Sequence, residues 1–369
     1  MSVSTERLAF LALHFVPGVG NFLVKQLISY CGSAEAVFQS PKGKLLKIPN
    51  VGEVTAQSIK TGAPLREAEE EFGKAQKEGA EILFYTDDKY PSRLREIEDA
   101  PSVIYWKGQA NLDHAKIVAL VGTRQATAYG KKVTERLLDE LKPHRALVLS
   151  GLAYGIDIQA HKEALKNELP TIAVFGNGLD TIYPGQHRDT AHKMLNHGGW
   201  ITENSFGTKP DAHNFPARNR IIAGLCDALI VVEASEKGGA LITANIANSY
   251  NKDVFAVPGP VDGPFSAGCN QLIKSNRANL LTGVADLEYI MGWNAATPEP
   301  ARSPQLQLHL LSPEEQQIVR LLQEKNAPVG VDEISWRTGI PQGTLASLLL
   351  TLEFNGSIKS LPGKMYGLA

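Results

Sequence analysis

The sequence lacks several features that mark large classes of proteins. No run of 18 apolar residues occurs among its 369 residues, so no transmembrane helix is expected. The opening MSVSTERLAF lacks the basic and long apolar regions of a secretory signal. The three cysteines, Cys31, Cys226 and Cys269, are odd in number and far apart, which predicts free thiols rather than a disulfide framework. Together these features predict a cytoplasmic protein without a membrane partner.

An excess of one charge is also missing. The chain has 37 Lys and Arg against 39 Asp and Glu, a formal net charge of −2. A strongly basic chain would indicate a nucleic-acid partner by its field alone. A polyanion site in this chain must therefore be built from a few placed cations and backbone N–H groups.

Several motifs with known chemistry are absent from the sequence. There is no Walker A lysine motif, no H-E-x-x-H, no C-x-x-C and no G-x-S-x-G. The G-x-G after a predicted strand, Gly176-Asn177-Gly178, lacks the third glycine of a dinucleotide fingerprint. No cluster of residues has metal-ligand spacing. We therefore expect neither a metal nor a cofactor.

Residues 1–80 are predicted to form a helical domain. An apolar residue, Pro, a small or turn residue, Val and Gly occur twice before a helix, at residues 16–20 and 48–52. This repeat is typical of a helix-hairpin-helix or SAM-like domain, whose glycine turns can present backbone N–H groups to a phosphate. The alternative is a small packing domain that binds nothing.

Residues 81–292 are predicted to form an α/β domain. Short apolar runs, bounded by glycine and separated by helical segments, indicate a Rossmann-like, doubly wound and mostly parallel sheet. The predicted strands are 82–85, 117–121, 146–149, 171–175, 200–202, 228–232, 254–257 and 278–281.

The end of the chain is predicted to be a separate unit. Residues 293–311 are rich in Pro and Ala and read as a linker. Residues 312–369 have three helical segments and a hairpin, a winged-helix-like arrangement, and Ser312 with Glu315 forms a capping box. The third helix has no Lys or Arg, so a protein contact or packing role is as plausible as reading a DNA groove.

Ligands of a doubly wound sheet bind at the carboxyl ends of its strands. The first strand runs into Gly122, Thr123 and Arg124, which combine a close backbone approach, a hydroxyl and a guanidinium for a phosphate. The second ends at Ser150 and Gly151, whose hydroxyl and N–H groups suit an anion. The predicted strand 228–232 is followed by Lys237, Gly238 and Gly239. The lysine adds a cation, and the glycine turn can present backbone N–H groups to a phosphate.

The densest signal lies at the start of one helix, where cations stand beside an aromatic residue. Its residues are Phe215, Arg218, Asn219 and Arg220. Such a cluster suits single-stranded nucleic acid, because arginines hold phosphates while a ring stacks on a base. The alternative is that Phe215 packs into the core and one arginine pairs with Glu203 or Glu233.

The order of these motifs resembles one known family. The matching motifs are Gly122-Thr123-Arg124, Ser150-Gly151-Leu152-Ala153-Tyr154-Gly155-Ile156-Asp157, Gly178-Leu179-Asp180 with Tyr183-Pro184, Phe215-Pro216-Ala217-Arg218-Asn219-Arg220, Leu241-Ile242-Thr243-Ala244 and Val254-Phe255-Ala256-Val257-Pro258-Gly259. The chain is similar to the DNA-processing protein A (DprA/Smf) family of bacteria over roughly residues 90–290.

The resemblance implies a non-enzymatic protein that binds single-stranded DNA. It further implies that the protein protects incoming strands in natural transformation, helps to load the RecA recombinase and forms a homodimer through the Rossmann-like domain. The positions that match DNA-contacting loops of the family are Gly122 and Arg124, then Phe215, Arg218 and Asn219, then Gly238 and Gly239, with Lys209 in a loop where basic contacts occur.

Two other functions remain open from the sequence. A Rossmann-like nucleotide phosphoribohydrolase would carry an acidic catalyst at the helix start after its glycines, but residues 240–245 contain no carboxylate. A protein adaptor that acts through its winged helix would leave the arginines at the sheet edge unexplained.

Overall fold

The structure is a computed structural model that describes residues 3–293, 311–325, 328–355, 357–361 and 365–368. The chain forms two compact units, Met1–Ala295 and Ala296–Ala369. Nearly all of the predicted linker, residues 294–310, lies outside the described residues.

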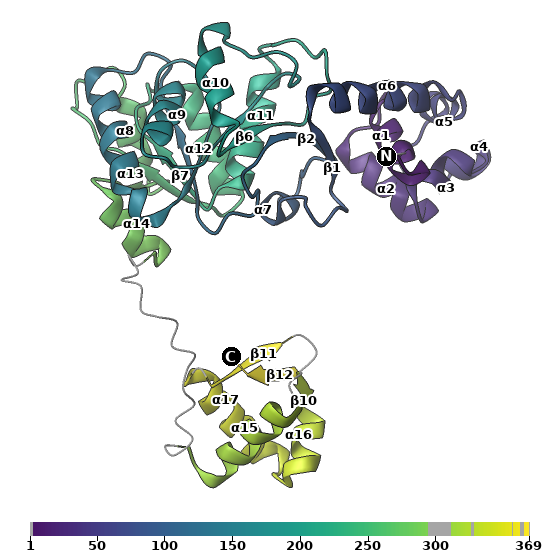
Figure 1. Ribbon diagram of the computed structural model, residues 1–369, viewed down its shortest axis with the longest axis vertical. Helices are drawn as coiled ribbons and strands as arrows, with labels where there is room; N and C mark the ends of the chain where they lie inside the picture. The colour runs from purple at the N-terminus through teal and green to yellow at the C-terminus, as the bar shows by residue number, and fades with distance from the viewer. Residues whose placement is uncertain (1–2, 294–310, 326–327, 356, 362–364, 369) are drawn as a thin grey trace. The chain divides into compact units, whose positions relative to one another are not determined.

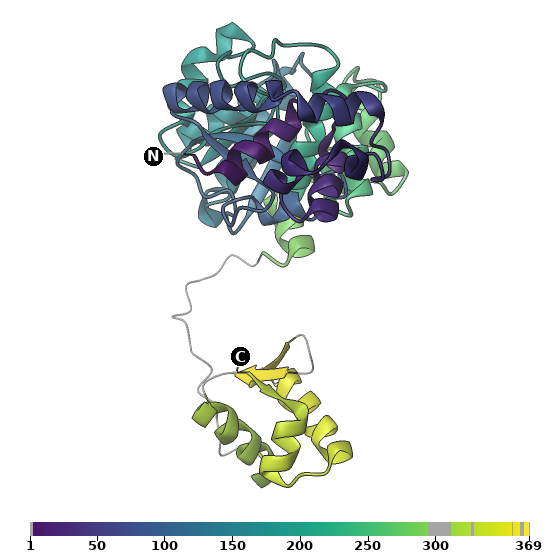
Figure 2. The ribbon, with the colours of Figure 1, turned by 90° about the vertical axis from the view of Figure 1, so that its right-hand side faces the viewer.

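The first unit begins with helices that pack on one end of a sheet (Figures 1 and 2). They are α1 (Thr5–His14), α2 (Asn21–Cys31), α3 (Ala34–Gln39), α4 (Lys42–Leu45), α5 (Glu53–Lys60) and α6 (Ala63–Glu78). Gly20 and Gly52 stand at the N-caps of α2 and α5, as the repeated motif predicts. Apolar residues of these helices share a core with Ile82, Phe84 and Tyr105 of the sheet. The helices before residue 81 therefore pack against the Rossmann-like sheet within one unit.

The sheet has the order β1-β2-β6-β5-β4-β3-β7-β8-β9. Its strands are β1 (Glu81–Phe84), β2 (Val103–Gly108), β3 (Ile117–Val121), β4 (Leu147–Ser150), β5 (Thr171–Val174), β6 (Gly199–Thr202), β7 (Ala228–Val231), β8 (Asp253–Ala256) and β9 (Asn279–Leu280). The seven strands that follow one another in the sheet as β6-β5-β4-β3-β7-β8-β9 are parallel. Strand β2 pairs with β6, and β1 pairs with β2, in antiparallel fashion. The predicted doubly wound, mostly parallel sheet is confirmed.

Alternation along the strands divides their side chains between two helical layers. Ile117, Ala119 and Val121 of β3 lie in one apolar core, and Val118 and Leu120 lie in the other, because successive side chains of a strand point to opposite faces. The helices over the first face are α7 (Ser92–Arg95), α11 (Asn214–Leu225), α12 (Gly239–Ser249) and α13 (Ala267–Lys274). Those over the second face are α8 (Ala128–Glu140), α9 (Ile156–Lys166) and α14 (Val284–Met291). A further helix, α10 (Arg188–Met194), lies beside β5 and β6.

The second unit has the winged-helix arrangement that the sequence predicts. Its elements are α15 (Pro313–Lys325), β10 (Val329–Gly330), α16 (Val331–Thr338), α17 (Gln342–Phe354), β11 (Ile358–Leu361) and β12 (Met365–Leu368). The backbone N–H of Ser312 donates to Glu315, and the N–H of Glu315 donates to the Ser312 hydroxyl, which confirms the capping box. The outer face of α17 carries Leu350 and Phe354, 55% and 83% exposed.

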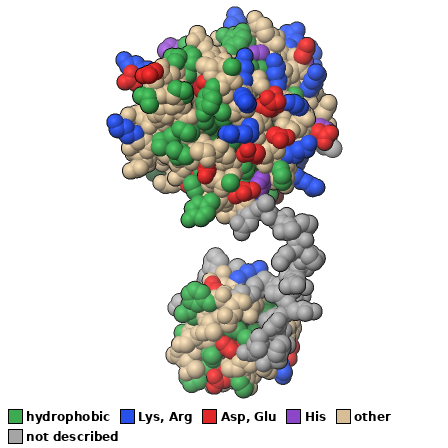
Figure 3. Space-filling model, turned by 90° about the vertical axis from the view of Figure 1, so that its left-hand side faces the viewer, with side chains coloured by type: hydrophobic (Ala, Val, Ile, Leu, Met, Phe, Trp, Pro, Cys, Tyr) green, Lys and Arg blue, Asp and Glu red, His purple; other side chains and the backbone are tan. Residues whose placement is uncertain are grey.

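Charges are mixed on the surface of the first unit. Figure 3 shows the face opposite the N-terminal helices, where basic and acidic side chains alternate with apolar ones. This mixture agrees with the net charge of −2. On this face, therefore, no field of one sign would attract a polyanion.

Candidate nucleic-acid interface

The strand order reverses between β3 and β7, the point at which a doubly wound sheet forms a ligand crevice. A cavity of about 410 Å³ opens there. Its walls come from the segments that follow β3, β4 and β7 and from helix α11. The lining residues that the sequence predicts are Gly122, Thr123, Arg124, Phe215, Arg218, Asn219, Gly238 and Gly239.

Helix α11 faces the cavity with one stripe of side chains. Phe215, Arg218, Asn219 and Ile222 line it, and their spacing of three, four and seven residues is that of one helix face. Arg220 is two residues from Arg218, so its side chain leaves the helix in another direction.

The Phe215 ring lies among cations at the cavity. The guanidinium carbons of Arg124 and Arg218 are 5.8 and 5.9 Å from its centroid. Gly176 lets the ring approach the backbone, since a Cβ there would be 3.0 Å from Cδ1 of Phe215. The ring is half-buried rather than sealed in the core. A base that stacked on it would have the exposed Arg124 within reach of its phosphate.

Arg218 forms the buried floor of the cavity rather than an exposed arm. Its side chain is 5% exposed. It donates to the carbonyl oxygen of Gly151 at 2.7 Å and to that of Val174. Burial lowers the pKa of Arg218 to about 10, an effect that the charge of Asp157 opposes and that of Arg124 increases. Arg218 therefore ties the ends of β4 and β5 together while adding positive charge beneath Phe215.

The loop after β3 fits tightly against its neighbours. The N–H of Thr123 donates to the Glu233 carbonyl at 2.7 Å, and the Thr123 carbonyl accepts from Ile156 at 3.1 Å. A Cβ on Gly122 would lie 2.5 Å from Ile156, so only glycine fits. Gly155, at φ +78°, would place a Cβ 2.1 Å from the Thr123 carbonyl oxygen. This packing fixes the backbone that carries Arg124.

The Gly238-Gly239 turn brings a helix N-terminus to the cavity. Gly238 is the N-cap of α12, and a Cβ on Gly239 would meet no atom within 4 Å. The first turn of α12 contains no acidic residue, so its N–H groups and the helix dipole favour an anion. Lys237 is exposed beside this turn but does not line the cavity.

Like Lys237, the predicted residues Ser150 and Gly151 do not line the cavity. Ser150 is fully buried, and its hydroxyl donates to the Leu120 carbonyl at 2.6 Å. The N–H of Gly151 donates to Asp157 at 3.1 Å, and its carbonyl accepts from Arg218. Because their polar groups are engaged inside the protein, these residues brace the loop rather than hold an anion.

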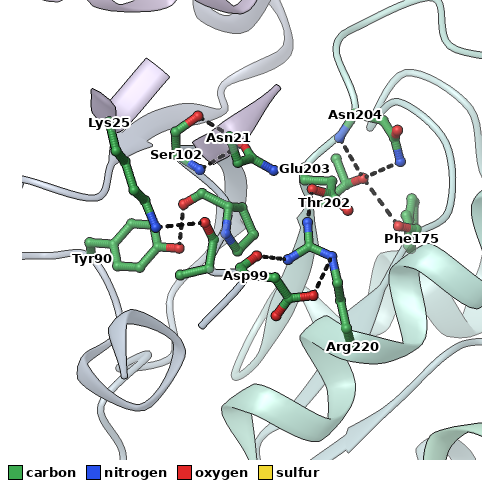
Figure 4. Close-up of polar contacts among 12 residues, drawn as sticks. Asn21, Lys25, Tyr90, Asp99, Ser102, Phe175, Thr202, Glu203, Asn204 and Arg220 are labelled. Carbon is green, nitrogen blue, oxygen red and sulfur yellow. Dashed lines mark hydrogen bonds and ion pairs between the residues drawn. The ribbon is translucent and has the colours of Figure 1, made fainter. Parts of the chain in front are cut away.

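Arg220 does not line the cavity with Arg218, as the sequence predicted it would. It points toward the N-terminal helices and donates to Glu203 and to the Asp99 carbonyl (Figure 4). Pairing with Glu203 is the alternative that the sequence left open. Burial raises the pKa of the Glu203 carboxyl, and the charge of Arg220 opposes that rise. Lys209 is exposed and lies outside the cavity lining.

The start of helix α2, just after the first glycine hairpin, contacts the loop before β2. Oδ1 of Asn21, the first residue of α2, accepts from the Ser102 N–H at 2.9 Å and from its hydroxyl at 2.8 Å. Lys25 donates to the Ala100 carbonyl at 3.0 Å. These contacts join the helical segment to the loop before β2 (Figure 4). The start of α2 is therefore a docking surface.

Three residues at or beside the cavity were not among the predicted site residues. Asp157 lines the cavity, and burial raises the pKa of its carboxyl against the charge of Arg218. Thr243 lines it one turn into α12. The ring of Tyr183 lies 5.9 Å from that of Phe215. The position of Asp157 in the first turn of the helix after β4 was a signal, whereas the position of Tyr183 depends on a long loop.

Within the part of the chain that the structure describes, no group of three or more His, Cys, Asp or Glu is placed to hold a metal ion. Over the same residues, no helix combines the length and apolar character needed to cross a bilayer. The three cysteines are free thiols.

Comparisons with known proteins agree over most of the chain. The family described as "DNA recombination-mediator protein A" matches residues 81–291, and "DprA winged helix domain" matches residues 296–364. Protein Smf of Synechocystis sp. is 33% identical over 98% of this chain and 99% of its own length. Protein Smf of Escherichia coli is 36% identical over 74% of each chain.

Two solved structures are similar to more than half of this chain. The X-ray structure of DNA processing protein A from Streptococcus pneumoniae has a TM-score of 0.69 and 32% identity, covering 78% of this chain and 98% of that one. DNA processing protein A from Helicobacter pylori, described for its single-stranded DNA binding mode, has a TM-score of 0.53 and 29% identity, covering 58% of this chain and 96% of that one.

Proposed function

Because this chain belongs to the DprA/Smf family, we propose that it binds single-stranded DNA at the cavity between β3 and β7. The observation that carries the proposal is the meeting of Arg124, the Phe215 ring and the Gly238-Gly239 helix start at one cavity. The cation and the N–H groups hold phosphates, and the ring stacks on a base whatever its identity. The Helicobacter pylori relative, described as binding single-stranded DNA, supports the same ligand.

A single strand fits this arrangement better than a duplex. Stacking on Phe215 requires the face of an unpaired base, which a duplex keeps inside its stack. Only one exposed arginine, Arg124, is among the lining residues, so the phosphate contribution is small. Affinity then depends on stacking and on several sites engaging one strand.

The wider role that we propose follows the family. The protein protects incoming strands in the cytoplasm during natural transformation and helps to load RecA onto them. It acts by binding rather than by catalysis. In support, Asp157 is the one carboxylate among the cavity-lining residues, and it accepts hydrogen bonds from the Gly151 and Ala153 N–H groups. A phosphoribohydrolase would need a carboxylate free to act on substrate.

We also propose that two copies associate through the Rossmann-like domain. The edge strand β9 supplies unpaired backbone groups, and Leu280 on it is 46% exposed. Tyr289 and Ile290 on the following helix α14 are 89% and 38% exposed. A dimer would double the number of cavities on one strand and so raise avidity. Sedimentation of the chain and of its Tyr289→Glu variant tests this: the variant is expected to be monomeric.

The test of DNA binding is a titration of labelled oligo-dT with two arginine variants. Arg124→Ala is expected to weaken binding and to lower the slope of log K against log salt by about one phosphate contact. The control is Arg277→Ala. Arg277 is an exposed arginine just before β9, at the amino ends of the parallel strands, whereas the cavity lies at their carboxyl ends. Equal affinities for both variants would reject the site. RecA assembly on coated DNA, with and without the protein, tests the loading role.

A further inference from the structure

A second aromatic side chain extends the surface that begins at Phe215. The ring centroid of Tyr183 is 5.9 Å from that of Phe215, with 31° between the ring planes. Tyr183 comes from the loop after β5, whereas Phe215 begins α11. It is 47% exposed. A large ring that packs beside a site yet leaves half its surface in solvent has room to take a further stacking partner.

Buried polar contacts hold the loop that presents Tyr183. The Asn177 side chain is 2% exposed and donates to the carbonyl oxygens of Gly178 and Thr181, at 2.9 and 2.5 Å. After the tyrosine, Nδ1 of the buried His187 lies 2.7 Å from the Leu152 carbonyl oxygen. Buried contacts therefore hold the loop on both sides of Tyr183.

The neighbouring loop adds another exposed ring along the same edge. Tyr154, after β4, is 42% exposed, and its hydroxyl donates to Gln186 at 2.8 Å. Its ring meets His187 edge-on, with centroids 4.9 Å apart. The loops after β4 and β5 are thus tied together, and both lie on the β5 side of the cavity.

The strand order shows in which direction the two rings follow Arg124 along the carboxyl edge of the sheet. Arg124 follows β3, and Tyr183 follows β5, the second neighbour of β3. Two strand spacings of ~4.8 Å separate the ends of β3 and β5, about 10 Å along the carboxyl edge of the sheet. Phe215 lies between them, in contact range of both. A single-stranded DNA that passes over Phe215 therefore reaches Tyr183 only if it is longer than the stretch of nucleotides that fills the cavity.

We propose that Tyr183 stacks on the base next to the one that Phe215 holds. This inference rests on the proposed function and specifies the path of the DNA: the single strand leaves the Arg124 cavity along the carboxyl edge toward β5. Stacking accepts any base, so the step lengthens the binding site without adding sequence preference. Because no charge is involved, it adds affinity that salt does not weaken.

The test compares two substitutions of Tyr183 over oligo-dT chains that grow by one nucleotide. Tyr183→Leu removes the ring, and Tyr183→Phe keeps it. Above a threshold length, Tyr183→Leu is expected to weaken binding about five- to tenfold, with an unchanged salt slope, whereas Tyr183→Phe binds like the parent. Tyr30→Leu, at a tyrosine 56% exposed on α2, is the control. A photoreactive 5-iodouracil next to the Phe215-bound base is expected to crosslink to Tyr183.

The dependence on length separates direct stacking from support of the Phe215 ring. If Tyr183→Leu weakened the shortest binding oligonucleotide as much as the longest, Tyr183 would act only by holding Phe215, and the inference would be overturned. Unchanged affinity at every length would overturn it as well, while leaving the cavity as the binding site. If the unmodified protein did not bind oligo-dT at any length, the proposed function itself would fail.

Discussion

Removing Arg218 should destabilise the protein, whereas removing Arg124 should not. Arg218 is 5% exposed and donates to the carbonyl oxygens of Gly151 and Val174. Arg218→Ala leaves these strand-end carbonyls without their donor. Hydrogen bonds from a charged group contribute about 1.5–3 kcal/mol each. Because water can enter from the cavity and replace part of this, we expect a net loss of about 3 kcal/mol in the free energy of unfolding.

Thermal unfolding measures this difference directly. For a domain of this size, ~3 kcal/mol corresponds to a fall in Tm of about 6–12 °C. Arg124 is exposed, so Arg124→Ala should change stability by less than about 0.5 kcal/mol. Arg218→Lys retains the charge but not the planar fork that reaches two carbonyls, and it should recover only part of the loss.

The two variants should also differ in how DNA binding fails. Arg124→Ala is expected to bind oligo-dT more weakly while it unfolds at the parent temperature. Arg218→Ala is expected to lose affinity together with stability. If Arg218→Ala unfolded at the parent temperature, the contacts to Gly151 and Val174 would not be structural, and the assignment of Arg218 to the cavity floor would be refuted.

Three further predictions follow from contacts around the site. Gly176→Val should push Phe215 from its place, since even a Cβ there would lie 3.0 Å from the ring, and should weaken oligo-dT binding about tenfold; unchanged affinity would show that the ring is not used. Burial lowers the pKa of His161 to about 3, and the charges of His187 and Arg218 add to the effect. The unfolded chain therefore binds a proton first, and stability should fall as pH drops below about 6.5, by up to ~1.4 kcal/mol per pH unit. Urea unfolding at neutral and mildly acidic pH checks this, and His161→Gln should show a shallower dependence. Arg220→Ala leaves the largely buried Glu203 unpaired and should cost about 2 kcal/mol, partly recovered by adding Glu203→Gln; the salt slope of DNA binding should stay at the parent value.

The sheet and the cavity were predictable because their signals are local. The apolar run of β3 and the helices around it indicate a parallel strand, and strands of that kind bring their carboxyl ends to one edge. Gly122, Arg124 and Gly238 therefore had to lie near one another once the order of strands was known. Strand β2 also has a local signal, the run Val103-Ile104-Tyr105-Trp106, but its antiparallel pairing with β6 joins distant parts of the chain and has no local pattern.

The directions of the two α11 arginines could have been read from helix geometry. Residues two apart on a helix differ by about 200° in direction, so Arg218 and Arg220 could not both face the cavity. Which of them would be buried depends on distant partners, Gly151 and Val174 for one and Glu203 for the other. Tertiary contacts of this kind have no local pattern, and the same holds for the approach of Tyr183 to Phe215.

The most direct test of the account is a salt titration with oligo-dT and a duplex of equal length, followed by fluorescence anisotropy. A cavity that stacks an unpaired base beside one exposed arginine should favour oligo-dT clearly at every salt concentration, with a shallow salt slope. Phe215→Leu should remove most of that preference. Equal binding of the duplex, or a steep salt slope that Phe215→Leu leaves unchanged, would contradict the account.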